Sequence, residues 1–163
     1  MMDYVQIQGR LNENVVLRLE RAIESESMNL SVIIIGVDAK GANIFQIRDP
    51  GHADCFKRIG FHAIGSGLPH AISTFISFNY TPNMDLKNAV YIMYEAKKNA
   101  EKAPGVGKEA TDMGIISGNE IRIIKADEMK LLEEVYKKKM EFGRKGIMEV
   151  EEMIKDLPLE ESK

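Results

Sequence analysis

The sequence predicts an α+β fold in which mainly antiparallel sheets are layered with helices. Short β-branched runs are joined by tight turns, and such hairpin connections place neighbouring strands antiparallel. Segments with an apolar residue every three or four positions lie before, between and after these runs, and this is the spacing of amphipathic helices. Helices grouped apart from antiparallel strands are typical of α+β domains.

The first half of the chain predicts one helix and then three strands. Residues 11–26 carry apolar side chains at helical spacing, and Asn12 or Asn14 can cap the N-terminus of this helix. Three strand-like runs follow and are joined by the turns DAKGAN and DPGHAD, which predicts an antiparallel meander. We expect these strands at residues 30–38, 43–49 and 55–64.

Two helices are predicted in the middle of the chain. The first begins after Gly67, carries Pro69 in its first turn, where the missing N–H costs nothing, and ends near residue 79. The segment TPNMD ends it, and Asp85 caps the second helix. The apolar face of this second helix is expected at Leu86, Val90, Met93 and Ala96.

A hairpin and a long helical region close the chain. The runs TDMGIIS and EIRIIKA, joined by a Gly-Asn turn, predict the hairpin. From Asp127 onward, apolar or small residues recur every three or four positions as far as Leu157, which is the seam of a long amphipathic helix. Gly143 and Gly146 interrupt the seam, so one helix and two helices both remain open. We divide the chain into an α/β domain, residues 1–126, and a C-terminal helix or helix pair packed on it, residues 127–163.

Composition narrows the class of protein. A chain of 163 residues fits one domain. Because the net charge is −3 and the sequence has no basic patches, we expect no binding to nucleic acid. The longest apolar run is too short to span a bilayer, and MMDYVQIQGR is not a secretory signal, so we expect a cytoplasmic protein without membrane contact. The single cysteine, Cys55, excludes an internal disulfide. Abundant Lys, Glu and Ile beside three Gln are typical of thermophile proteins.

Three segments in order resemble the second half of proteasome-family subunits, a family that includes the bacterial two-component threonine protease. They are AIGSGLPHAISTF, YTPNMDLKNAVYIMYEAKKNAEKA and TDMGIISGNEIRII, and the preceding VIIIGVDAKGANIFQI is also similar to the family's strand, turn and strand. The resemblance covers residues 12–126. It implies part of the family's N-terminal-nucleophile hydrolase sandwich, in which two antiparallel sheets stack between helix layers.

The resemblance also bears on catalysis. Active family members use a processed N-terminal threonine as nucleophile and base, tuned by a lysine and an aspartate from the first strands. This chain begins at what resembles the family's first long helix, and its Met1 start is not a threonine. Ser66 matches the family's Gly-Ser-Gly serine, which supports the nucleophile's amine. The family's later Asp and Ser align near Pro104 and Gly107, and neither position has the required side chain. The resemblance therefore implies no catalytic residue except the candidate Ser66.

Two site candidates follow from the residues themselves. Ser66 as a nucleophile needs His62 or His70 as a base, and its alternative role is a helix cap through the hydroxyl. His52 and Cys55 form an H-x-x-C pair, but two ligands do not make a zinc site. No metal and no cofactor are therefore expected.

Two last segments carry little chemistry. GVGKE, residues 105–109, is similar to part of a phosphate loop, but it lacks the full motif and precedes a strand. Thr111 begins a predicted strand, as nucleophiles of this superfamily do, and cleavage after Ala110 would expose it. The following DMGIIS matches an internal family strand instead.

These observations predict a non-catalytic, proteasome-like structural or assembly domain that self-associates or pairs with a complementary proteasome-like chain. Half of a stacked-sheet fold would leave sheet faces such as that of Val32 and Ile34 bare, and patches of that size rarely stay uncovered. Two alternatives remain open. One is the C-terminal fragment of a threonine-type hydrolase, with peptidase activity only in a longer chain, and the other is a small α+β binding module of unknown ligand.

Overall fold

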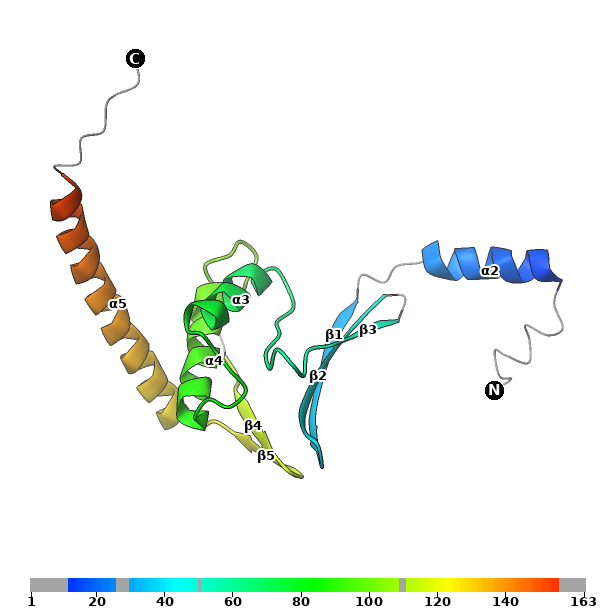
Figure 1. Cartoon of the computed structure of the whole chain (residues 1–163), viewed down its shortest axis with the longest axis horizontal. Coiled ribbons are helices and arrows are strands. Elements are labelled where there is room, and N and C mark those ends of the chain that lie inside the picture. The colour runs from blue at the N-terminus through cyan, green and yellow to red at the C-terminus, as the bar shows by residue number, and fades with distance from the viewer. Residues whose placement is uncertain (1–11, 26–29, 50, 109–110, 156–163) are drawn as a thin grey trace, which may run out of the picture.

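The computed structural model describes residues 12–25, 30–49, 51–108 and 111–155 and shows the predicted mixture of helices and small antiparallel sheets (Figure 1). A three-stranded sheet follows the first helix, then come two helices, a two-stranded sheet and a long helix. The elements are α2 (Glu13–Ser25), β1 (Ser31–Asp38), β2 (Gly41–Arg48), β3 (His52–Cys55), α3 (Leu68–Ser77), α4 (Leu86–Ala100), β4 (Gly114–Ser117), β5 (Glu120–Ile123) and α5 (Ala126–Ile154).

Both sheets are built from hairpins, as predicted. In the first sheet the strand order is β1-β2-β3, and the β1–β2 ladder closes where Asp38 pairs with Gly41. The Asp38 carboxylate accepts a hydrogen bond from the Lys40 amide at 2.7 Å, and Gly41 has φ +104°, a conformation that favours glycine. In the second sheet β4 and β5 turn at Gly118, which has φ +58°. Local turn chemistry therefore explains both hairpins.

The third strand lies earlier than predicted. We expected it at residues 55–64, but β3 is the four-residue segment His52–Cys55, and the chain then turns. The carbonyl of Phe56 accepts hydrogen bonds from the amides of Ile59 and Gly60 at 3.1 and 2.8 Å. Gly60 has φ +81°, which ends extended structure, and Phe61 next stacks on Phe75 of α3. Aromatic packing on a helix therefore replaces strand pairing here.

The core lies between α3 and α4. Its buried apolar residues are Ala71 and Phe75 from α3 and Ile92 and Ala96 from α4. Phe75 stacks on Phe61, with ring centroids 4.6 Å apart. The partly buried residues around this cluster are Phe61, Ala63, Phe78, Tyr80, Met84 and Ala100. A pair of helices and the loop before it thus form the compact centre of the chain.

Asp85 caps α4, as the sequence predicts. Its carboxylate accepts hydrogen bonds from the amides of Lys87 and Asn88 at 3.0 and 3.4 Å. The predicted apolar face of the helix is only partly correct. Ala96 is buried, but Leu86 and Met93 are exposed, because α3 packs on the side of Ile92 and Ala96.

The C-terminal region is one continuous helix, α5, of 29 residues. Its N-terminal half meets α4, where the Tyr94 hydroxyl donates to the Glu133 carboxylate and the Tyr94 and Tyr136 rings meet edge to face. Farther along, α5 extends away from the other elements (Figure 1). None of its residues, all of which are described, is buried. Within the described ranges, no helix has the length and apolar character needed to cross a membrane.

Phe75→Ala should lower the free energy of unfolding by about 3–5 kcal/mol, because it removes a buried ring that two other aromatic rings contact. Urea titration followed by circular dichroism measures this. Ile76→Ala is the control on the same helix, since that side chain is 64% exposed and its loss should change stability by less than about 0.5 kcal/mol. Equal effects of the two substitutions would contradict this core.

Candidate functional site

The Gly-Ser-Gly segment forms the turn that leads into α3, and glycine is required at each of its two positions for a different reason. Gly65 has φ +95°, a backbone conformation that other residues rarely adopt. Gly67 lies against the end of α4, where an added Cβ would be 2.7 Å from the Ala100 Cβ and 3.0 Å from its carbonyl oxygen. Both glycines are therefore required by the fold without any chemical role.

Ser66 does not cap α3 through its hydroxyl, which corrects the structural role that the sequence suggested. The N-cap residue is Gly67, and no side chain accepts a hydrogen bond from the first turn. Pro69 occupies the first turn, as predicted, where a helix tolerates a missing N–H. Within the described residues, the Ser66 hydroxyl makes no hydrogen bond.

Ser66 instead borders a mostly apolar cavity of about 520 Å³ between the loop and α4. The apolar part of its lining includes Phe75 and Met93, and the polar part includes His62, Thr111 and Asp112. Two candidates from the sequence, Ser66 and Thr111, therefore line the same cavity. His70 does not join them, since it lines a different cavity on the other side of α3.

His62 borders the same cavity as Ser66 but is engaged elsewhere. Its Nε2 lies 2.9 Å from the Gln46 Oε1, and its ring stacks on Phe56 with centroids 3.7 Å apart. Burial lowers the pKa of His62, and the nearby Asp54 carboxylate only partly opposes this, so the ring is neutral at pH 7. A neutral imidazole can accept a proton, but no hydrogen bond joins this one to Ser66 in the described structure.

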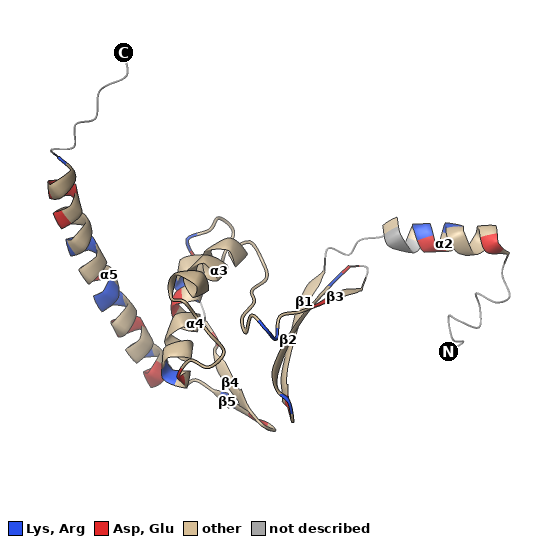
Figure 2. Cartoon of the chain, in the orientation of Figure 1, with Lys and Arg blue, Asp and Glu red and all other residues tan. Residues whose placement is uncertain are grey.

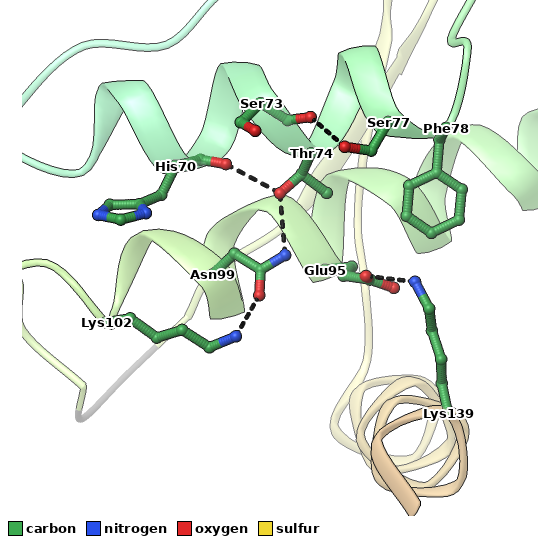
Figure 3. A pocket seen from close by; sticks show the side chains of 9 residues that line it. All are labelled: His70, Ser73, Thr74, Ser77, Phe78, Glu95, Asn99, Lys102 and Lys139. Carbon is green, nitrogen blue, oxygen red and sulfur yellow. Dashed lines mark hydrogen bonds and ion pairs between the residues drawn. The ribbon is translucent and has the colours of Figure 1, made fainter. Parts of the chain in front are cut away.

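A second, polar cavity of about 340 Å³ lies between α3, α4 and α5 (Figure 3). A chain of hydrogen bonds runs along its wall. The Thr74 hydroxyl donates to the His70 carbonyl at 2.8 Å, the Asn99 amide donates to Thr74 at 2.9 Å, and Lys102 donates to Asn99 at 2.8 Å. These bonds tie α3 to α4 and give the Thr74 hydroxyl and the Asn99 amide hydrogen-bond partners.

The floor of this polar cavity holds a buried carboxylate. Glu95 is 6% exposed, and Lys139 from α5 donates a hydrogen bond to its Oε1 while lying 4.0 Å from the centroid of the Phe78 ring (Figure 3). The hydroxyl of Tyr91 is also buried, and its pKa is raised by burial and next by the Glu95 carboxylate beside it. The pair Glu95–Lys139 joins α5 to the helical core, and sequence spacing alone did not reveal it.

Two lysines surround another buried carboxylate at the end of α4. Glu101 accepts hydrogen bonds from Lys97 and Lys98, the latter at 2.9 Å, and is 7% exposed. Burial raises the pKa of Glu101, but the two ammonium groups outweigh it, so the net pKa is lowered. The pKa of Lys98 is raised, mainly by its hydrogen bond to Glu101. A carboxylate with a lowered pKa is a poor proton donor at neutral pH. Lys98 also lies 3.8 Å from the Glu133 carboxylate of α5, so this cluster links the two helices.

The remaining sequence candidates are not brought together. His52 and Cys55 both lie in β3, three residues apart, so their side chains leave opposite faces of the strand. In the described ranges there is no group of three or more His, Cys, Asp or Glu that could hold a metal ion. The loop around Gly105 follows a helix and leads to β4, and residue 109 of GVGKE lies outside the described residues. Thr111 lies before β4, which starts at Gly114.

No protein-family model matches this chain, and no curated protein matches it.

Gly67→Ala should lower the free energy of unfolding by about 1–3 kcal/mol, because the new methyl group would overlap the backbone of Ala100. Gly107→Ala is the matched control, since nothing lies within 4 Å of its added Cβ. Ser66→Ala, between the two glycines, should change stability by less than about 0.5 kcal/mol because the hydroxyl caps nothing. Thermal melts of the three variants beside the parent check this. A loss at Ser66 as large as that at Gly67 would restore the capping role.

Proposed function

We propose that this chain is a non-catalytic structural or assembly domain of the proteasome-like type, and that it functions by associating with further copies of itself. One observation carries the proposal. Strand β1 is an edge strand of its sheet, it is eight residues long, and most of its side chains are apolar and exposed. Its bare residues are Val32, Ile34, Ile35 and Val37.

An edge strand of this kind is a strong physical signal. Its outer side offers unpaired N–H and C=O groups, and soluble proteins normally protect such edges with charges, prolines or a covering element. Between Ser31 and Asp38, no lysine, arginine or proline interrupts the run. Exposed side chains occur on both faces, since Ile34 and Ile35 are neighbours in the strand and are 50% and 56% exposed. The strand therefore favours cover by another chain on its edge and on both faces.

Apolar residues that recur with the periodicity of a buried face are exposed in other elements as well. Val15 and Leu19 of α2, Met93 of α4 and Ile121 and Ile123 of β5 are all exposed. All of these residues lie in the described part of the chain. Their number supports an assembled rather than a solitary chain.

The geometry around Ser66 supports a non-catalytic role. Its hydroxyl has no hydrogen-bonded base among the described residues, His62 is held by Gln46, and His70 faces another cavity. The ionised Glu101 and the paired Glu95 serve contacts between helices. Nucleophilic catalysis needs a base within hydrogen-bond reach, and the described residues provide none.

The resemblance to proteasome-family subunits supplies the kind of assembly. The order of elements, with a helix, strands, two antiparallel helices, a hairpin and a last helix, follows the order in that family's second half. We infer that the partial sandwich is completed between chains, with the bare faces of the two small sheets covered by a partner. Self-association is the simplest form of this, since one chain type then covers its own patches.

A second candidate function is a threonine-type hydrolase completed by a further segment or chain. The observation that favours it is the cavity of about 520 Å³ beside the unpaired Ser66 hydroxyl and Asp112. By resemblance, Ser66 would support an incoming nucleophile's amine there. In this case the chain contributes a supporting serine, and the nucleophile comes from outside the sequence.

We expect the purified chain to have a solution mass at least twice 18.3 kDa at micromolar concentration, since burial of β1 and its neighbours drives association. Light scattering coupled to gel filtration over a range of concentrations measures the mass. Ile34→Lys places a charge on the bare strand and should reduce it, whereas Ile76→Lys, on an exposed position of α3, should not. A persistent monomer would sink the proposal and favour a small binding module.

The chain alone should not hydrolyse peptides, because no base among the described residues is hydrogen-bonded to Ser66. Fluorogenic peptides, tested with and without a threonine-directed covalent inhibitor, measure this. Ser66→Ala provides a matched sample. Turnover that the inhibitor blocks and that Ser66→Ala abolishes would favour the hydrolase instead.

A further inference from the structure

The apolar seam of α5 changes from covered to bare halfway along the helix. Met129, Leu132 and Tyr136 are half-buried on the side where α5 meets α4. Beyond the Lys139–Glu95 pair the seam continues in the same register, and its members are exposed. Its exposed members are Met140, Gly143, Ile147, Val150 and Ile154, spaced alternately by three and four residues. This is the repeat of an interface between two helices.

Two glycines lie in or beside this bare stretch. Glycine inside a helix costs about 1 kcal/mol relative to alanine, and Gly143 and Gly146 both lie within α5. Nothing lies within 4 Å of a Cβ built on either of them. Small residues on a helix face allow a second backbone to approach closely. A neighbouring helix can therefore pack closely against this face of α5.

Charge along α5 is arranged in blocks (Figure 2). Residues 137–145 contain five basic side chains and one acidic one, and residues 149–152 contain three glutamates and no basic residue. Arg144 and Glu151 flank the seam, and no ion pair joins either of them to another described residue. The basic and acidic blocks complement each other only if two copies of the helix run in opposite directions.

We propose that the C-terminal half of α5 pairs antiparallel with the same segment of a second copy of this chain. The pairing rests on the proposed function, self-association, and adds a second contact surface to the bare sheet faces. The two-fold axis lies between Ile147 and Val150, so each Ile147 meets Val150 of the partner subunit and each Gly143 meets Ile154 of the partner subunit. Arg144 then lies beside Glu151 of the partner subunit, twice by symmetry.

A parallel pairing of the same seam is disfavoured by charge. It would place the two basic blocks, residues 137–145, side by side, and the two glutamate blocks likewise. A different stripe of α5 is also exposed, including Leu131, Val135 and Phe142, but Lys138 and Lys145 interrupt it. The seam through Ile147 and Val150 is thus the continuous apolar face with complementary charge.

Charge reversal tests the pairing. Arg144→Glu should raise the dimer dissociation constant about tenfold, because each of two attractive contacts becomes repulsive. Lys145→Glu carries the same charge change one residue away, where the side chain points from the seam, and should have little effect. Glu151→Arg alone should weaken the dimer like Arg144→Glu. Sedimentation equilibrium of the full-length chain measures each constant, and circular dichroism checks that each variant keeps its helix content.

Mixing the two weakened variants makes the test specific. In a mixed antiparallel pair, one contact joins the glutamate introduced at position 144 to the arginine introduced at position 151, and the other contact keeps the original Arg144 and Glu151. Both contacts are then attractive, so an equimolar mixture of R144E and E151R should regain the parent's affinity. Equal effects of Arg144→Glu and Lys145→Glu, or a mixture that stays weak, would overturn the proposal while self-association stands. A parent chain that is monomeric at every concentration would overturn both.

Discussion

The close packing of α3 on α4 is the constraint on which the rest of the structure depends. It is tightest where Gly67 lies against Ala100, so the start of one helix meets the end of the other. The core residues Phe75 and Ile92 lie farther along the same contact. Because α5 is attached to α4 by Glu95 and Glu133, the direction of the long helix follows from this packing too. All four residues of the buried core come from α3 and α4, and no strand of the described sheets contributes to it.

This arrangement explains the Gly-Ser-Gly segment without catalysis. Gly65 is fixed by its positive φ and Gly67 by the backbone of α4, and the serine between them is left facing a cavity with an unused hydroxyl. The same geometry would be kept in a protein that uses the serine and in one that does not. The motif therefore indicates the fold more strongly than the activity, and no base among the described residues is hydrogen-bonded to Ser66.

Local rules predicted those elements whose ends are set by their own residues. The two hairpins, the Asp85 cap and the start of α3 after Gly67 all follow from turn or cap chemistry that the sequence shows directly. The predicted position of the third strand was wrong because the decisive contact, Phe61 stacking on Phe75, joins a loop to a later helix. The predicted cap at Ser66 was wrong for a similar reason, since the N-cap residue is Gly67, which packs against Ala100. The Glu95–Lys139 pair, 44 residues apart, has no local signature.

The faces that were predicted as core and found bare are informative in a different way. Periodicity marks a face that needs cover, but it does not say which chain provides it. Met93 and Leu19 have the spacing of buried residues, yet the described structure leaves them exposed. Val32 is exposed too, on the sheet face that was expected to need a partner. The helical core is small. Covering these faces would stabilise the protein by about 25 cal/mol for each Å² of apolar surface buried. An assembly that covers them would add this stability, and for such a protein folding and association are coupled through protein concentration.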